Sequence, residues 1–322
     1  GIRTDVRVIC LELLNTDWYI DQMVHKAYDS DPVPFSLTQD QYRQGTRDVV
    51  LFHDRGVKGN IPVKDLIEFV KSDNHADQLE VAAGTYYNYF PTKNVSVPVD
   101  SATVVNNGTV SKANAGRIVK SIDWTLTGSY VQKNDLMVLD LLAHNNWKRP
   151  IYFAATAPAS SYLNLAPYLQ LEGLAYRLVP IKQNEAESQQ ETRVATDIMY
   201  NNVMDPNKFK WGGMDKQGVY LDDVFLRSCA LNVRQRMGSL ASQLVTEGKK
   251  DKAIKVLDKC VEVTPEFHEP YDGTMFSIVL GYYQADASAK ANELAKKLFN
   301  NSESNINYYY SFKGKKRAEF GS

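Results

Sequence analysis

The chain changes character near residue 185, and this change constrains the fold more than any other feature of the sequence. Before it, short runs rich in β-branched residues alternate with stretches whose apolar residues recur at helical spacing. After it, strand-like runs almost disappear and one helical pattern follows another. Because strand–helix alternation is typical of α/β domains, we predict a mostly parallel, Rossmann-like three-layer sheet domain, followed by an all-α region.

Two strand–helix units support the α/β prediction. Residues 6–13 form a near-continuous apolar run, as expected of a strand covered on both faces, and residues 15–17 then offer caps to a helix through residue 26. Residues 49–52 predict a second strand, and Pro62 suits the first turn of a helix over residues 63–70. Because Pro98 removes a ladder donor, residues 95–99 predict an edge strand or a loop. Further strands are predicted over 122–127, 149–155 and 174–181, and a helix over 135–145.

The second half predicts helical hairpins of the tetratricopeptide type. Residues 182–192 are polar throughout and predict a solvated connection or a mobile loop. Helical patterns then cover 194–204, 222–247, 250–263, 274–285 and 288–300. Ala241 opposite Ala253 would let the helices of the first pair approach closely, and Pro265 would close this pair. We therefore predict an α/β domain over 1–185, a connecting helical segment over 186–232 and tetratricopeptide-like hairpins over 233–322.

Composition and motifs exclude several classes of function. The 37 Lys and Arg residues balance 38 Asp and Glu residues, a net charge of −1, so the chain lacks the basic field of a nucleic-acid-binding protein. No apolar stretch is long enough to span a bilayer. Cys10, Cys229 and Cys260 are too far apart in sequence to indicate a disulfide framework or a zinc site. The nucleotide, zinc-protease and serine-hydrolase motifs are also absent, so we predict no cofactor, no metal and no catalytic residue.

Polar and aromatic residues suggest two kinds of binding site. The carboxyl ends of strands in α/β sheets form a rim where ligands bind, and a candidate rim combines residues that follow predicted strands with others in aromatic turns. These rim candidates are Asn15, Asp17, Trp18, His53, Asp54, Trp147, Arg149 and Trp211. A candidate peptide groove on the helical repeats contains Tyr282, Tyr283, Tyr308, Tyr309 and Tyr310. The simpler interpretation is that these residues are helix caps, tight turns and packed aromatic side chains.

Six strings of the sequence resemble the soluble C-terminal part of the DUF2723 family. They are LLNTDWYIDQ at 13–22, PVP at 32–34, QYRQGTRD at 41–48, NWKRPIYFA at 146–154, LEGLAYRLVP at 171–180 and FKWGG at 209–213. The resemblance runs in order from Arg3 to about Tyr271 and weakens over the final residues. The family consists of large multi-spanning membrane proteins of Bacteroidetes and relatives, similar to protein O-mannosyltransferases and classed as glycosyltransferase-like.

The resemblance implies that this chain is a piece of a longer membrane protein. It implies an N-terminal membrane region, absent here, and a location on the periplasmic face of the inner membrane. In lipid-linked-sugar transferases of this architecture, the carboxylates that engage acceptor and metal lie in loops of the membrane region. No such position is present in this chain, so the resemblance assigns it no catalytic residue.

Three hypotheses for function follow. In the first, the chain is a non-catalytic module whose helical pairs bind an acceptor polypeptide or the membrane part of the same protein. In the second, the α/β part is an independent sugar-binding or enzymatic domain, which requires Asn15, Asp17, His53 and Asp54 to converge in one pocket. In the third, the chain is a rigid structural cap for the membrane region.

Overall fold

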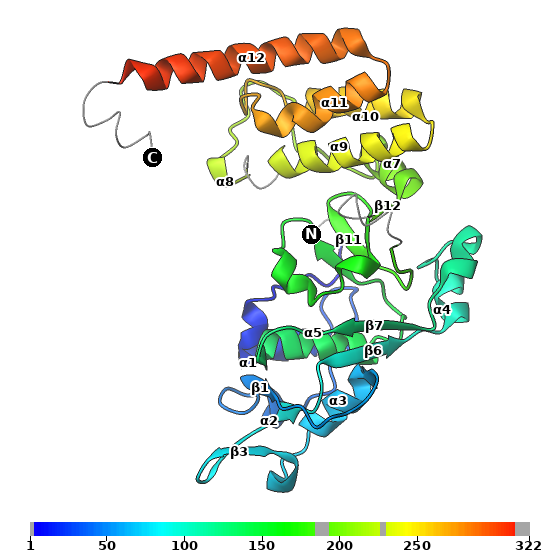
Figure 1. The fold of residues 1–322 in the computed structure, drawn as a ribbon, viewed down its shortest axis with the longest axis vertical. Coiled ribbons are helices and arrows are strands. Elements are labelled where there is room, and N and C mark those ends of the chain that lie inside the picture. The colour runs from blue at the N-terminus through cyan, green and yellow to red at the C-terminus, as the bar shows by residue number, and fades with distance from the viewer. Residues whose placement is uncertain (1–2, 184–192, 226–229, 313–322) are drawn as a thin grey trace. The chain divides into compact units, whose positions relative to one another are not determined.

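A computed structural model describes residues 3–183, 193–225 and 230–312. Most of the predicted connection over 182–192, and Cys229, therefore lie outside the described residues. Contacts divide the chain into two compact units. Unit 1 comprises Gly1–Tyr152, Ala157–Leu169 and Leu178–Thr192, and unit 2 comprises Phe153–Thr156, Gln170–Arg177 and Arg193–Ser322. Figure 1 labels four strands of unit 1, β1, β3, β6 and β7, and the long helices α9, α10 and α12 of unit 2.

One crossover helix, α3 (Val63–Val70), organises the strands of unit 1. It follows β1 (Val49–Phe52) and precedes β5 (Tyr89–Phe90), and these two strands pair in parallel. It also separates β2 (Ile61–Pro62) from β6 (Asn94–Pro98), a second parallel pair. The apolar face of α3 is buried, and α5 (Lys133–His144) packs against it. The strand–helix alternation therefore predicts the region around α3 correctly.

Antiparallel strands close both of these sheets, so the predicted Rossmann-like parallel sheet is wrong. β7 (Ser121–Thr125) runs antiparallel to β6, and β8 (Tyr130–Gln132) runs antiparallel to β1. The sheets β5-β1-β8 and β2-β6-β7 each have three strands, and β3 (Leu79–Ala82) and β4 (Thr85–Tyr87) form a separate hairpin. Among the described residues, the sheets contain two to four strands of mixed orientation instead of three layers around one parallel sheet.

Two local predictions in unit 1 also fail. Residues 6–13, predicted as a strand covered on both faces, form no strand. Val6 and Val8 are 47% and 80% exposed, and the first regular element is the short η1 (Leu13–Asn15). β6 is the central strand of its sheet despite Pro98, because this proline occupies the last strand position, opposite Ser121. The remaining elements of unit 1 are α1 (Asp17–Met23), α2 (Gln39–Tyr42), η2 (His75–Asp77), α4 (Ser101–Asn106), η3 (Lys112–Arg117), η4 (Ala159–Tyr162) and η5 (Ala166–Tyr168).

Unit 2 combines most of a four-stranded sheet with helices. The strand order is β12-β10-β11-β9, formed by Arg193–Val194, Leu169–Leu171, Ala175–Leu178 and Tyr152–Ala154 in that order. Two helices, α7 (Thr196–Met204) and the short α8 (Asp223–Phe225), come before the hairpins. The first hairpin is α9 (Leu231–Thr246) with α10 (Lys250–Val263), and the second is α11 (Phe276–Gln284), preceded by η7 (Gly273–Met275), with α12 (Ser288–Ser311).

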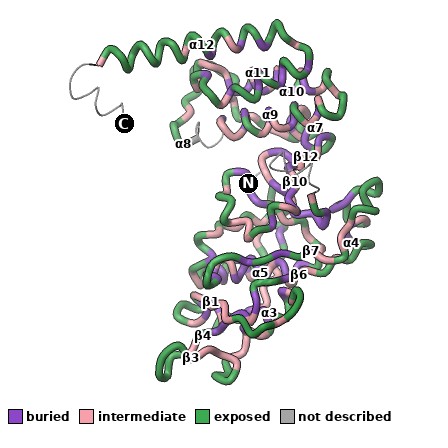
Figure 2. Tube along the Cα trace, viewed as in Figure 1, coloured by how far each residue is buried: buried purple, intermediate pink, exposed green. Residues whose placement is uncertain are grey.

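The predicted helical hairpins are present, and their contacts are those of stacked helix pairs. α9 packs on α10 and also on α11, which in turn packs on α12. Ala241 and Ala253 are fully buried, as their predicted place at the helix crossing requires. α12 extends to Ser311, well beyond the predicted end at residue 300. In Figure 2 the three shorter helices are largely buried on their inner faces, whereas the later half of α12 is exposed.

A fully buried arginine fixes the link between the two hairpins. The Arg234 guanidinium, on α9, donates to the carbonyl oxygens of Glu269 (2.8 Å) and Thr264 (3.3 Å) and to the Thr274 hydroxyl (3.2 Å). It also lies over the Tyr271 ring, 5.3 Å from the centroid. Because a buried cation needs hydrogen-bond partners, these contacts hold residues 264–274 against α9.

Candidate functional site

The rim residues Asn15 and His53 lie at opposite ends of β1. Asn15 Oδ1 accepts a hydrogen bond from the backbone N–H of Asn134 (3.1 Å), close to Gln132, which pairs with the first residue of β1. His53 follows the last residue of β1, where its N–H donates to the Phe90 carbonyl (3.0 Å) and its ring packs edge-on against Tyr89. The two side chains therefore occupy separate environments.

The two rim carboxylates bind backbone groups of their own turns. Asp17 Oδ1 accepts from the Trp18 N–H, and Asp54 Oδ1 accepts from the Gly56 N–H, both at 2.8 Å. Trp18 is half exposed and packs edge-on against Tyr19. The structure does not bring Asn15, Asp17, His53 and Asp54 together, which is the condition that the sugar-binding or enzymatic hypothesis sets.

Trp147 and Arg149 belong to one turn that joins distant segments of unit 1. Trp147 adopts a left-handed conformation (φ 60°), and its Nε1 donates to the Pro98 carbonyl (2.9 Å). The Arg149 guanidinium donates to the carbonyl oxygens of Asp31 and Pro32 and to the Ser30 hydroxyl, each at 3.1 Å. These donors are engaged within the protein, so the turn has a structural role.

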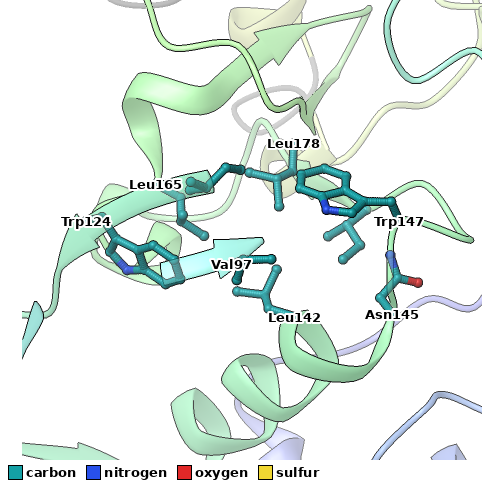
Figure 3. Close-up of a pocket in the computed structure, with 9 residues that line it drawn as sticks. Val97, Trp124, Leu142, Asn145, Trp147, Leu165 and Leu178 are labelled. Carbon is teal, nitrogen blue, oxygen red and sulfur yellow. The ribbon is translucent and has the colours of Figure 1, made fainter. Parts of the chain in front are cut away.

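A small apolar pocket lies beside this turn, with Trp124 at one end and Trp147 at the other (Figure 3). Its volume is about 20 Å³, room for about one water molecule and far below that of a sugar site. The side chains that line it are Val97, Ile122, Trp124, Leu142, Asn145, Trp147, Ile151, Leu165 and Leu178. We interpret it as a packing imperfection of the unit 1 core.

Trp211, the last rim candidate, belongs to unit 2 and packs against Phe209 with ring centroids 4.5 Å apart. Gly212 and Gly213 follow it with φ of 64° and 83°, values that favour glycine. Lys210 Nζ donates to the Pro206 carbonyl (2.7 Å), which keeps its charge within the same turn. This geometry is that of a glycine turn with an anchoring aromatic side chain.

The five tyrosines of the predicted peptide groove do not share one surface. Tyr282 is buried, and its hydroxyl donates to Asp258 Oδ1 (2.8 Å); burial and this carboxylate raise its pKa. Tyr283 bonds Asn292 Oδ1 (2.5 Å) near the start of α12, whereas Tyr308, Tyr309 and Tyr310 lie at its end. Sixteen helical residues separate Asn292 from Tyr308, which amounts to about 24 Å along the axis.

A pocket in the described part of unit 2 lies between α9 and α11. It has a volume of about 470 Å³, within the range of ligand sites. Leu231, Asn232 and Gln235 line it from α9, and Gly273, Thr274 and Ser277 line it from the facing segment. Four of these six residues carry an amide or hydroxyl group, and none carries a formal charge. We call this pocket the α9/α11 groove.

Exposed apolar side chains extend along α11 beyond the groove. Phe276, Leu280 and Tyr283 are 68%, 56% and 42% exposed, and their spacing of i, i+4 and i+7 places them on one face of the helix. Met275, Ile278, Val279 and Tyr282 form the buried side of the same segment. The sequence patterns did not predict this α11 ridge, although residues 275–283 contain more apolar side chains than one buried face requires.

The described part of the chain includes one exposed thiol, Cys10, and one buried thiol, Cys260. No group of three or more His, Cys, Asp and Glu side chains there could hold a metal ion. Burial raises the pKa of the Cys260 thiol to about 12, so this thiol is un-ionised at neutral pH.

A family model described as TMEM260-associated domain 2 matches residues 1–198, more than half of the chain. The chain belongs to this family. The description ties the TMEM260-associated domain to a membrane protein. No helix among the described residues has both the length and the apolar character to cross a bilayer.

The match to the TMEM260-associated domain covers unit 1 and stops within α7, before the α9/α11 groove begins. No curated protein and no solved structure gives a significant match to the chain.

Proposed function

We propose that the chain is a non-catalytic, polypeptide-binding module of a multi-spanning membrane protein of the DUF2723 glycosyltransferase-like kind, exposed on the periplasmic side. The family match supports an association with a membrane protein. The observation that carries the binding role is the α9/α11 groove together with the α11 ridge. The partner is an acceptor polypeptide, which the module binds before the membrane region modifies it.

The chemistry of the groove favours a polypeptide over a charged ligand. Side-chain amides both donate and accept hydrogen bonds, as the peptide backbone does, and Gln235 presents such an amide to the groove. Ser277 adds a hydroxyl group with the same dual capacity. A peptide backbone in the groove would therefore find matching partners along its length.

The ridge supplies the apolar part of such an interaction. Binding surfaces combine a few apolar or aromatic anchors with surrounding polar contacts. Phe276 and Leu280 are exposed on α11, one residue before and one helical turn after Ser277 of the groove, so a bound segment with apolar residues would bury them while its backbone contacts the groove. The preferred ligand is thus an uncharged, Ser/Thr-rich segment with one or two apolar residues.

Fluorescence anisotropy with the full chain tests this proposal. One labelled peptide is rich in serine and threonine and carries a leucine and a phenylalanine; its counterpart has both replaced by serine. We expect the first peptide to bind and the second to bind at least tenfold more weakly, a loss on the order of one buried apolar side chain.

Matched variants locate the binding site. Leu280→Ser should weaken binding of the anchored peptide about tenfold, and Gln235→Ala about fivefold. Phe267→Ser is the control for the first, because Phe267 is 54% exposed in unit 2 but does not line the groove. Gln243→Ala, further along α9, is the control for the second. Absence of binding, or equal losses in variants and controls, would contradict the proposal.

A further inference from the structure

The connection between β6 and β7 forms a small lobe of unit 1, with α4 and η3 as its helical elements (Figure 1). A short apolar cluster holds it together. The cluster consists of Val104, Val110 and Ile181, with Val99, Ile118 and Trp147 packed against them. We call residues 99–120, 147–148 and 180–182 the α4 lobe.

Hydrogen bonds join the three segments of the α4 lobe. The Val119 N–H donates to the Pro180 carbonyl (3.0 Å). Asn107 Nδ2, just after α4, donates to the Trp147 carbonyl (2.6 Å). The lobe is therefore one compact structure, although its segments lie far apart in the sequence.

Four exposed lysines surround the apolar cluster. They are Lys112, Lys120, Lys148 and Lys182, and each follows a residue of the cluster by one or two positions. Within the described residues, none of the four ammonium groups has a hydrogen-bond or ion-pair partner. Arg117, on η3, already has a partner in the chain and is left out of this group. The lobe thus presents four uncompensated positive charges.

The only carboxylate in the residues of the α4 lobe, Asp100, does not neutralise these lysines. It caps α4: its Oδ1 accepts from the Ala102 N–H (3.0 Å), and its Oδ2 accepts from the Thr103 hydroxyl (2.7 Å). Without Arg117, the excess is three positive charges, four minus one, whereas the whole chain has a net charge of −1.

We infer that the α4 lobe binds the headgroup layer of an anionic phospholipid bilayer through these lysines. Anionic headgroups attract basic side chains near the membrane surface, and the flexible lysine stem lets each ammonium group follow mobile headgroups. The remaining residues of η3 before Arg117 are two alanines, an asparagine and a glycine, so no bulky side chain there separates the lysines from a flat surface. The lobe belongs to unit 1 and the α9/α11 groove to unit 2, so the inference does not rest on peptide binding.

The exposed residues of the lobe favour a bilayer over an acidic protein. Among residues 99–120, all of which the structure describes, no valine or isoleucine is exposed. Interfaces between proteins depend on apolar or aromatic anchors, whereas attraction to headgroups needs only charge. The lobe also lies within residues 1–198, the part that matches a domain associated with a membrane protein.

Vesicle co-sedimentation of the full chain at low ionic strength tests the inference. We expect binding to vesicles of mixed phosphatidylcholine and phosphatidylglycerol, little binding to phosphatidylcholine alone, and release at high salt, because the attraction is electrostatic. The triple variant Lys112→Gln, Lys120→Gln and Lys148→Gln should lower the partition coefficient about 100-fold, at about fivefold per lysine.

A matched control removes three exposed lysines of unit 1 outside the lobe, by Lys26→Gln, Lys58→Gln and Lys64→Gln. It changes the net charge by the same amount and should leave binding within about twofold of the unmodified chain. Equal losses in the two triple variants, or equal binding to the two kinds of vesicle, would overturn the inference. Binding to immobilised polyglutamate without binding to the anionic vesicles would do so too and would assign the lobe to an acidic protein.

Discussion

Arg47 is 2% exposed and caps the C-terminal end of α3 by hydrogen bonds to its last carbonyl groups. Its guanidinium donates to the carbonyl oxygens of Val70 (2.8 Å) and Lys71 (2.9 Å) and to Asp73 Oδ1 (2.6 Å). The last carbonyls of a helix have no partner within the helix, and a cation there also interacts favourably with the helix dipole. Arg47 belongs to the string QYRQGTRD at 41–48, so this string has a structural role in unit 1.

Replacement of Arg47 should therefore destabilise unit 1 strongly. We expect Arg47→Ala to lower the free energy of unfolding by about 3 kcal/mol, because buried carbonyl groups lose a charged donor. Arg43→Ala is the control and should cost less than about 0.5 kcal/mol, since this side chain is exposed and lies 3.7 Å from an exposed carboxylate. Urea denaturation followed by tryptophan fluorescence measures both, because Trp18, Trp124 and Trp147 lie in unit 1. Similar losses in the two variants would contradict this role.

Cys10 and Cys260 should differ sharply in reactivity. Cys10 is exposed, whereas Cys260 is fully buried, and burial raises its pKa to about 12. At pH 8 we expect iodoacetamide to alkylate Cys10 in the native chain and Cys260 only after unfolding in urea, with mass spectrometry of the peptides as the measurement. Alkylation of native Cys260 as fast as Cys10 would contradict the buried position.

The same thiol should make stability depend on alkaline pH. The folded-state pKa lies above the ordinary value of 9.0, so the unfolded chain loses this proton at lower pH than the native chain. The contribution is therefore fully present below about pH 9 and decreases as the pH rises toward 12. Cys260→Ala should show a smaller decrease over this range in urea denaturation; an unchanged decrease would assign it to other groups.

At the scale of elements, the crossing of α9 and α11 depends on a glycine. A Cβ atom at Gly238 would lie 2.5 Å from Ser277 Oγ and 2.8 Å from Ser277 Cβ, closer than real contacts allow. The helices can approach this closely only because Gly238 has no side chain. This crossing also sets the width of the α9/α11 groove, because Ser277 lines it.

Gly238→Ala should therefore separate the two hairpins. We expect a loss of about 1–3 kcal/mol, because overpacking at the crossing outweighs the better helix propensity of alanine. Gly116→Ala is the control, because a Cβ atom at this position meets nothing within 4 Å. The measurement is urea denaturation followed by far-ultraviolet circular dichroism, which the long helices dominate. A neutral or stabilising Gly238→Ala would contradict the close crossing.

Single elements were more predictable from the sequence than their assembly. Residues 49–52, residues 63–70 and the helices of the hairpins have local signals in the spacing of their apolar residues, and the structure confirms these elements. Sheet order depends on pairing between distant segments, such as β1 with β8, which local patterns do not specify. Residues 6–13 were predicted as a strand from their apolar run alone. Such a run forms a strand only when a neighbouring strand pairs with it, and none does here among the described residues.

At the scale of the whole molecule, the family match and the proposed site fall in different parts of the chain. The match to TMEM260-associated domain 2 covers residues 1–198, where Arg47, Trp147 and Arg149 bind backbone groups and hold distant segments together. The groove and the ridge lie in α9 and α11, beyond the match. We therefore expect the matched part to serve as a scaffold and the helical hairpins to provide recognition.

The candidate site was only partly predictable from the sequence. The helical pairs led us to predict a peptide groove, and of the five tyrosines named for it Tyr282 is buried and only Tyr283 belongs to the α11 ridge. Periodicity alone does not distinguish a buried face from an exposed one on a helix that is apolar on both. Asn232 and Gln235 carry no sequence signal, because polar residues on exposed helix faces are common.

Hydrogen exchange of the full chain, with and without the anchored Ser/Thr-rich peptide, tests the central claim most directly. The account predicts that peptide binding slows exchange over residues 231–235 and 273–284, while residues 15–18, residues 53–54 and the turn at Trp211 exchange as before. Slowed exchange at residues 15–18 and 53–54, with none at the α9/α11 groove, would contradict it and would favour a binding site in unit 1.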